Sequence, residues 1–183
     1  MARTRFMENI KRSQRLDVAL TGNVLVDNTA AETDILKSGS LMRLDISSGF
    51  NFVFEFAGIA STSGATSPLT IRLRYGDSNT GTPVLEIAST FSISQTDKAF
   101  RGKIYGRIEP GSTDAIVATG ELFFNSATPA TVYANTAIGG TATDFAGANS
   151  LNELRLTAQW TAAASARKFD VMYARLTVIK TPV

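Results

Sequence analysis

Carboxylates on predicted strands are the residues of this chain that could do acid–base chemistry. Glu55, Glu86, Glu109 and Glu121 each lie on, or at the end of, a run in which apolar residues alternate with polar ones. A glycoside hydrolase needs two such carboxyl groups that face each other across a sugar. Each of the four falls on the face opposite the apolar side chains, where Arg and Lys of neighbouring strands can pair with it. Surface ion pairs therefore explain them better than catalysis, and a carboxylate-dependent hydrolase is the least favoured of three functions considered.

The 183 residues include no cysteine and no histidine. This excludes disulfides, zinc sites built on Cys or His, a Ser–His relay and a Cys nucleophile. What remains is the chemistry of carboxylates, Lys or Tyr, or no chemistry at all. We therefore predict that the protein is not an enzyme and that it uses no cofactor.

Residues 76–81, GDSNTG, hold the nearest approach to a metal-binding motif. Asp77 and Asn79 stand two residues apart, as the first two ligands of a calcium loop do. The third ligand and the distal Glu of that loop are missing. An ordinary turn is the favoured interpretation, and no metal site is predicted.

A row of basic residues is predicted to point outward from two strands. It comprises Arg72 and Arg74 on one strand and Arg101, Lys103 and Arg107 on another. If the two strands are neighbours, the row forms a patch for phosphate or an acidic polysaccharide. Because acidic residues are nearly as numerous in this region, a solvated or subunit-contacting face is favoured.

The first segment carries the excess positive charge. Residues 1–17 contain five basic and two acidic residues, a net charge of +3, against +2 for the whole chain. This arm could be disordered, could line an interior filled with nucleic acid, or could dock on a partner protein. Docking is favoured because apolar residues are interleaved with the charge, and five basic groups give only weak, salt-sensitive affinity for nucleic acid. Its candidate partner-binding residues are Arg3, Arg5, Phe6, Met7, Ile10, Lys11, Arg12 and Arg15.

Alternating apolar residues predict the strands that must position these groups. The clearest run is FNFVFEFAGI, in which four phenylalanines at alternate positions from Phe50 to Phe56 share one face. Similar alternation begins at Leu69, Val84 and Phe100, and shorter runs begin at Asn23, Asp34, Leu41 and Ala115. Segments rich in Gly, Ser, Thr and Pro separate them and predict turns. About ten strands and no helix after the arm are expected.

The end of the chain, ELRLTAQWTAAASARKFDVMYARLTVI, contains two further strands. In the first, Leu154 to Trp160 alternate as in a half-buried strand. In the second, Phe169, Val171 and Tyr173 fall on one face of an extended chain. The opposite face collects a second apolar set, which forms the candidate oligomer interface: Met172, Ala174, Leu176 and Val178. A strand that is apolar on both faces is either central in a monomeric sandwich or covered by a second subunit, and the oligomer is favoured.

The patterns predict an all-β fold, a jelly-roll-like antiparallel β-sandwich with a short basic N-terminal arm. The arm is expected at residues 1–21 and the sandwich domain at residues 22–183. No apolar run approaches the length of about 20 residues that spans a bilayer, so no membrane partner is predicted.

Several stretches resemble the jelly-roll structural proteins of tailed bacteriophages. They are NTAAETDIL (28–36) with SGSL (38–41), LTIRLRYGD (69–77) and LRLTAQWTAAASARKFDVMYARL (154–176). The resemblance implies a virion component, often a homotrimer, that decorates a capsid or belongs to a tail or fibre. It offers no catalytic residues. Because the chain lacks the long shaft of a typical fibre, the resemblance favours a capsid decoration protein.

Two non-enzymatic functions are therefore expected. The first is a decoration (cement) protein of the virion, assembled in the host cytoplasm, which binds the major capsid protein or another virion protein as a homotrimer. The alternative is a tail- or fibre-associated module that recognises a host surface glycan, with Tyr105, Tyr133 and Phe145 as aromatic candidates. Specific binding of nucleic acid is not expected.

Overall fold

The computed structural model describes residues 15–39, 50–62, 67–75, 83–91, 95–109, 115–124, 131–137, 153–164 and 166–180. These residues form eleven strands and no helix, which confirms the all-β prediction. The predicted run from Leu41 and the turn at 76–81 lie outside the described residues. The strands are β1 (Arg15–Ala19), β2 (Val24–Asp27), β3 (Thr33–Lys37), β4 (Phe50–Thr62), β5 (Ser67–Tyr75), β6 (Pro83–Phe91), β7 (Gln95–Glu109), β8 (Ala115–Phe124), β9 (Thr131–Ala137), β10 (Leu154–Trp160) and β11 (Lys168–Lys180).

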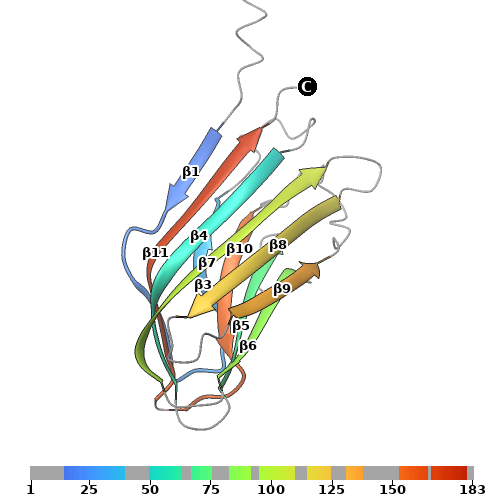
Figure 1. The fold of residues 1–183 in the computed structure, drawn as a ribbon. Coiled ribbons are helices and arrows are strands. Elements are labelled where there is room, and N and C mark those ends of the chain that lie inside the picture. The colour runs from blue at the N-terminus through green and yellow to red at the C-terminus, as the bar shows by residue number, and fades with distance from the viewer. Residues whose placement is uncertain are drawn as a thin grey trace, which may run out of the picture.

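Two antiparallel sheets make up the sandwich. The large sheet has the order β1-β11-β4-β7-β8-β9, with β2 also paired to β11, and the small sheet has the order β3-β10-β5-β6. In Figure 1 the large sheet runs from β1 on the left to β9 on the right, and the small sheet lies behind it. The chain passes from the small to the large sheet between β3 and β4, and again between β10 and β11. Because β3 pairs with β10 and β4 with β11, these segments form one antiparallel ribbon rolled over both layers, as in a jelly roll.

The phenylalanines of β4 fill the space between the layers as predicted. Phe50, Phe52, Phe54 and Phe56 are each at most 2% exposed. Burial of each such side chain contributes about 1.5–3 kcal/mol. The apolar layer that covers them comes from the small sheet and includes Leu69, Ile71, Leu73, Leu85, Ile87, Leu154, Leu156, Ala158 and Trp160, all at most 1% exposed.

Glycines on β7 make room for two of these rings. Phe52 pairs with Gly106 and Phe56 with Gly102 in the register of β4 and β7. A Cβ atom on Gly102 would lie 2.1 Å from Cζ of Phe56, and one on Gly106 would lie 2.5 Å from Cζ of Phe52. The rings therefore occupy the space that side chains of β7 would need.

The indole of Trp160 ties the two layers together. It belongs to β10 of the small sheet, is fully buried, and donates a hydrogen bond from Nε1 to the carbonyl oxygen of Val26 in β2 at 3.1 Å. A buried indole N–H without a partner is costly, so this bond fixes where β2 lies against β10.

A β-bulge in β11 corrects the prediction of a closing strand that is apolar on both faces. The register with β4 shifts between Val171 and Tyr173, so one extra residue stands in β11 at that point. Such a shift moves the following side chains to the other face. Phe169 and Val171 before the bulge, and Ala174 after it, therefore all face the core, while Met172 and Tyr173 are exposed.

Strands begin earlier in the chain than the predicted domain start at residue 22. β1 pairs with β11 from Arg15↔Ile179 to Ala19↔Arg175, and Val18 and Leu20 pack against the core. The last part of the predicted arm is thus an edge strand of the large sheet. The segment Arg3–Arg12 of the arm lies outside the described residues.

Candidate functional site

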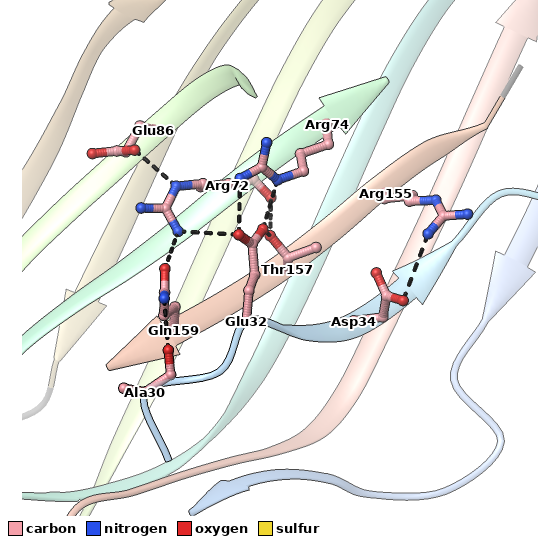
Figure 2. A network of polar contacts seen from close by, with 9 residues as sticks. All are labelled: Ala30, Glu32, Asp34, Arg72, Arg74, Glu86, Arg155, Thr157 and Gln159. Carbon is pink, nitrogen blue, oxygen red and sulfur yellow. Dashed lines mark hydrogen bonds and ion pairs between the residues drawn. The ribbon is translucent and has the colours of Figure 1, made fainter. Parts of the chain in front are cut away.

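The outer face of the small sheet carries a polar network centred on Glu32 (Figure 2). This residue lies just before β3, in a loop that two contacts hold in place: Thr29 Oγ1 accepts a hydrogen bond from the amide of Ala31 at 3.0 Å, and Gln159 Nε2 donates to the carbonyl of Ala30 at 2.6 Å. The loop therefore holds the Glu32 carboxylate over the sheet, where it can reach β10 and β5.

Two arginines of β5 bind this carboxylate. Arg74 makes a bidentate contact with it: Nε donates to Oε1 at 2.6 Å and Nη2 donates to Oε2 at 2.8 Å. Arg72 Nη1 lies 3.4 Å from Oε2. The hydroxyl of Thr157 on β10 donates a further hydrogen bond to Oε1. Forked contacts of this kind are the strongest ion pairs of proteins and restrict both partners in orientation.

Arg72 extends the network to the next strand. Its Nε donates to Glu86 on β6 at 2.8 Å, and its Nη1 donates to the side-chain oxygen of Gln159 at 2.6 Å. On the far side of β10, Arg155 lies 3.1 Å from Glu153 and 3.7 Å from Asp34. Contacts of this one face therefore join all four strands of the small sheet.

The network sets the charge state of Glu32. Burial of the carboxylate by itself raises its pKa, but hydrogen bonds from Arg74 and Thr157, with the charges of Arg74 and Arg72, outweigh burial and lower the pKa below its ordinary value. A carboxyl group that stays ionised and fully hydrogen-bonded is suited to a structural role, and it is a poor general acid at neutral pH.

The predicted basic row does not form a patch. Arg72 and Arg74 lie on the outer face of the small sheet, whereas the other three residues of the row lie on β7 of the large sheet, whose outer face is on the opposite side of the sandwich. Their charges are also engaged locally: Arg101 stacks on the ring of Phe123 at 5.1 Å from its centroid, and Lys103 lies 3.2 Å from Glu55.

Two of the four predicted carboxylates form ion pairs with a neighbouring strand, as expected. Glu55 lies 3.2 Å from Lys103, and Glu86 lies 2.8 Å from Arg72. The side chain of Glu109 lies outside the described residues. Within the described part of the chain, no cluster of three acidic side chains could hold a metal ion. The same residues include no helix long and apolar enough to cross a membrane.

The outer face of the large sheet is the second candidate site. It carries half-exposed apolar side chains: Tyr105 and Val117 are each 47% exposed, Tyr173 is 46% exposed and Ile179 is 40% exposed. Two hollows lie on this face. One has a volume of about 620 Å³ and is lined by residues that include Asn51, Val53, Tyr105, Val117 and Thr119, and the other has about 390 Å³ and is lined by residues that include Glu55, Lys103, Glu121 and Tyr173.

The four residues predicted to contact other subunits are divided by the bulge in β11. Ala174, Leu176 and Val178 are at most 1% exposed and belong to the core of their own chain, so they present no second apolar face. Met172 is 54% exposed. The outward residues of β11 are instead Tyr173, Arg175, Thr177 and Ile179. The sequence pattern does not identify them, because strict alternation along the whole strand places Ala174, Leu176 and Val178 on the outward face.

Arg15, the last of the predicted partner-binding residues, lies on β1 beside Asp17. The carboxylate of Asp17 accepts hydrogen bonds from Arg15 Nε at 2.6 Å, Thr177 Oγ1 at 2.7 Å and Arg175 Nη2 at 3.0 Å. The hydrogen bond from Arg15, followed by that from Thr177, holds the pKa of Asp17 far below its ordinary value. Asp17 therefore fastens β1 to β11 through side chains as well as through the backbone.

We expect Asp17→Asn to loosen β1 selectively. The amide group keeps a hydrogen-bond acceptor but loses the charge that Arg15 and Arg175 contact. Hydrogen exchange of the β1 amides should become faster, while exchange of the β4 amides stays unchanged. Asp27→Asn is the matched control, because Asp27 is an exposed carboxylate on β2, the other strand that pairs with this edge of β11. Unaltered exchange in β1 of Asp17→Asn would contradict the role given to this carboxylate.

None of the protein-family models and none of the curated proteins compared with the chain matches it. Among solved structures, the chain is similar to the CBM2 module of the evolved Dit of Lactobacillus casei BL23 phage J-1. The TM-score is 0.35 and the sequence identity 10%, over 92% of this chain and 97% of that one. A similarity of this size does not assign the chain to a family or give it a function.

Proposed function

We propose that the protein is a non-enzymatic structural protein of a bacteriophage virion, and that it acts as a decoration (cement) protein which binds and stabilises the capsid lattice. One observation carries the proposal. The three segments that resemble phage jelly-roll proteins contribute β3, β5, β10 and most of β11, and the first three of these are adjacent strands of the small sheet.

The polar residues of the three segments also contact one another. Glu32 comes from the first segment, Arg72 and Arg74 from the second, and Thr157 and Gln159 from the third. These contacts follow from the pairing of β3, β10 and β5, and they give the residues of the three segments a structural use without catalysis.

A particle-binding experiment tests this proposal. Capsids of the source phage, prepared without this protein, are mixed with the purified chain and sedimented. We expect saturable binding and a higher temperature of capsid disruption, because a protein that binds only the assembled lattice stabilises it by mass action. Absence of the chain from the capsid pellet at all concentrations would contradict the proposal.

The contribution of the arm is tested with a variant that lacks residues 2–14. The deletion stops before Arg15 because β1 belongs to the large sheet. We propose that the truncated chain folds but no longer binds capsids, since Arg3, Arg5, Phe6, Met7, Ile10, Lys11 and Arg12 are the proposed anchor. Retained binding would remove the anchor and leave the sandwich itself as the capsid-binding part.

A glycan-binding function is the second candidate, and Tyr105 favours it. This half-exposed aromatic ring lies at the 620 Å³ hollow with Asn51 and Thr119, the combination of ring and polar groups that sugars bind. A glycan array in which binding is lost on Tyr105→Ala would favour this function. The other aromatic candidates, Phe145 and the side chain of Tyr133, lie outside the described residues.

The homotrimer remains an implication of the resemblance alone. The second apolar face that the sequence predicts on the closing strand does not support it, because Ala174, Leu176 and Val178 lie in the chain's own core. A contact between copies therefore requires a different surface.

A further inference from the structure

The outer face of the large sheet has a regular arrangement of side chains across β11, β4, β7 and β8. The register of the strands places the outward residues in level rows, each with one residue from each strand in that order. One row is Arg175, Glu55, Lys103 and Glu121. The next row is Thr177, Val53, Tyr105 and Thr119, and the row beyond it is Ile179, Asn51, Arg107 and Val117.

The charged row alternates in sign across the four strands: Arg175 is positive, Glu55 negative, Lys103 positive and Glu121 negative. Within the chain, Lys103 Nζ lies 3.2 Å from Glu55, and both side chains are nearly half exposed. Read in the opposite direction, the row has the opposite sign at every position. When the same row of a second copy faces it in reversed order, each charge therefore lies against an opposite charge.

We infer that this face binds the same face of a second copy of the chain, about a two-fold axis that runs along the strands between β4 and β7. Rotation about this axis lays β7 of the second copy on β4 and β8 of the second copy on β11. Glu55 then faces Lys103 of the second copy, and Arg175 faces Glu121 of the second copy. Contacts of this self-complementary kind are the commonest in homodimers.

The uncharged rows fit the same axis. Val53 faces Tyr105 of the second copy next to the axis, and Ile179 faces Val117 of the second copy farther out. Tyr105, Val117 and Ile179 are among the apolar side chains that the single chain leaves half exposed. A two-fold axis at right angles to the strands, through the charged row, would instead lay β4 on β4 and bring Glu55 against Glu55, which is a like-charge contact.

The face is large enough for a specific contact. A fourth row, on the other side of the charged row, consists of Tyr173, Ala57, Arg101 and Phe123. Four strands about 4.8 Å apart and four rows about 6.8 Å apart cover roughly 500 Å² on each copy. The total of about 1,000 Å² reaches the size from which specific interfaces are found. Two twisted sheets pack face to face with their strands about 30° apart, so the pairs nearest the axis, Glu55–Lys103 and Val53–Tyr105, make the closest contacts.

Two charge reversals test the inference. Sedimentation velocity over a range of concentrations should show the wild-type chain passing from one chain mass to two. Glu55→Lys puts lysine against Lys103 of the second copy, and Lys103→Glu puts glutamate against Glu55 of the second copy. Each variant alone should associate at least about tenfold more weakly than wild type. The matched control, Ala88→Lys, adds a charge to the outer face of the small sheet and should leave association unchanged.

A mixture of the two variants distinguishes loss of the contact between copies from loss of folding. In a 1:1 mixture, each altered residue of one chain faces an opposite charge on the other, so a mixed dimer should form with nearly wild-type affinity. A misfolded variant could not be rescued in this way. The inference is overturned if the mixture stays monomeric, if either variant alone associates as wild type does, or if the wild-type mass is that of one chain or three. A monomer that binds glycans through Tyr105 would assign the face to sugar instead.

Discussion

Gly58→Ala should lower the free energy of unfolding by about 3 kcal/mol. A Cβ atom at this position would lie 1.9 Å from the carbonyl oxygen of Asp170 on β11, and 3.0 Å from Cζ of Phe100. The nearer atom belongs to the backbone, so no change of rotamer can relieve the overlap. Gly58 also pairs with Val171, the residue at which the β11 bulge begins. The methyl group therefore pushes apart the two strands whose register the bulge sets.

Denaturant unfolding measures this effect, with Gly22→Ala as the matched control. A Cβ atom on Gly22 would meet nothing within 4 Å. Where the backbone allows it, such a change leaves stability equal or raises it slightly, because alanine restricts the unfolded chain. Equal unfolding midpoints for the two variants would show that β4 and β11 do not approach each other as described.

The second large effect is expected for Glu32→Gln, at about 2–3 kcal/mol of stability. The substitution keeps the shape of the side chain but removes the charge, which leaves the guanidinium groups of Arg74 and Arg72 without their shared carboxylate. Their side chains are only 9% and 17% exposed, so water cannot fully replace it. Because of this partial exposure, the expected loss of stability is smaller than the loss of about 3–5 kcal/mol for breaking a fully buried ion pair.

Glu86→Gln is the control for this prediction. Glu86 also binds Arg72, but its side chain is 46% exposed, and exposed pairs contribute less than about 1 kcal/mol. Thermal or denaturant unfolding of the two variants at neutral pH gives the comparison. If Glu86→Gln costs as much as Glu32→Gln, the network does not depend on the buried carboxylate.

The pKa of Glu32 adds a dependence on pH. Because folding lowers this pKa, the folded chain binds the proton less readily than the unfolded chain does. The stability that Glu32 supplies is thus complete above the ordinary pKa of a glutamate, about 4.3, and is lost as the pH falls through the lower folded value. The difference in stability between wild type and Glu32→Gln should therefore be largest at neutral pH and shrink in acid.

The alternation of β4, β5 and β7 is the part of the fold that can be predicted from sequence. Phe50 to Phe56 on one strand and Leu69 to Leu73 on another face the core because a strand repeats every two residues and one face of each sheet is wet. The same reasoning finds β1 if it is applied to Leu16, Val18 and Leu20. These residues fall within the predicted arm, residues 1–21, because no Gly or Pro separates them from its basic part.

The bulge in β11 and the Glu32 network could not be predicted in the same way. A bulge shifts the phase of alternation by one residue, and its only trace in the sequence is that Val171 and Ala174 stand three apart. Glu32 has no local partner, since Arg72 and Arg74 are 40 and 42 residues away along the chain. The sequence pattern shows that the arginines of β5 and β7 point outward, but it does not show that the two strands belong to different sheets. The sequence therefore does not reveal that the basic row is divided between opposite faces of the sandwich.

The cysteine-free chain allows a direct measurement of which sheet face meets another copy. Single cysteines are placed at Val117 on the outer face of the large sheet and at Ala88 on the outer face of the small sheet, and their rates of alkylation are measured as protein concentration rises. We expect the Val117→Cys thiol to react more slowly at high concentration, while the Ala88→Cys thiol reacts at a constant rate. A constant rate at position 117, or protection of position 88 instead, would contradict the assignment of the large sheet as the contact surface.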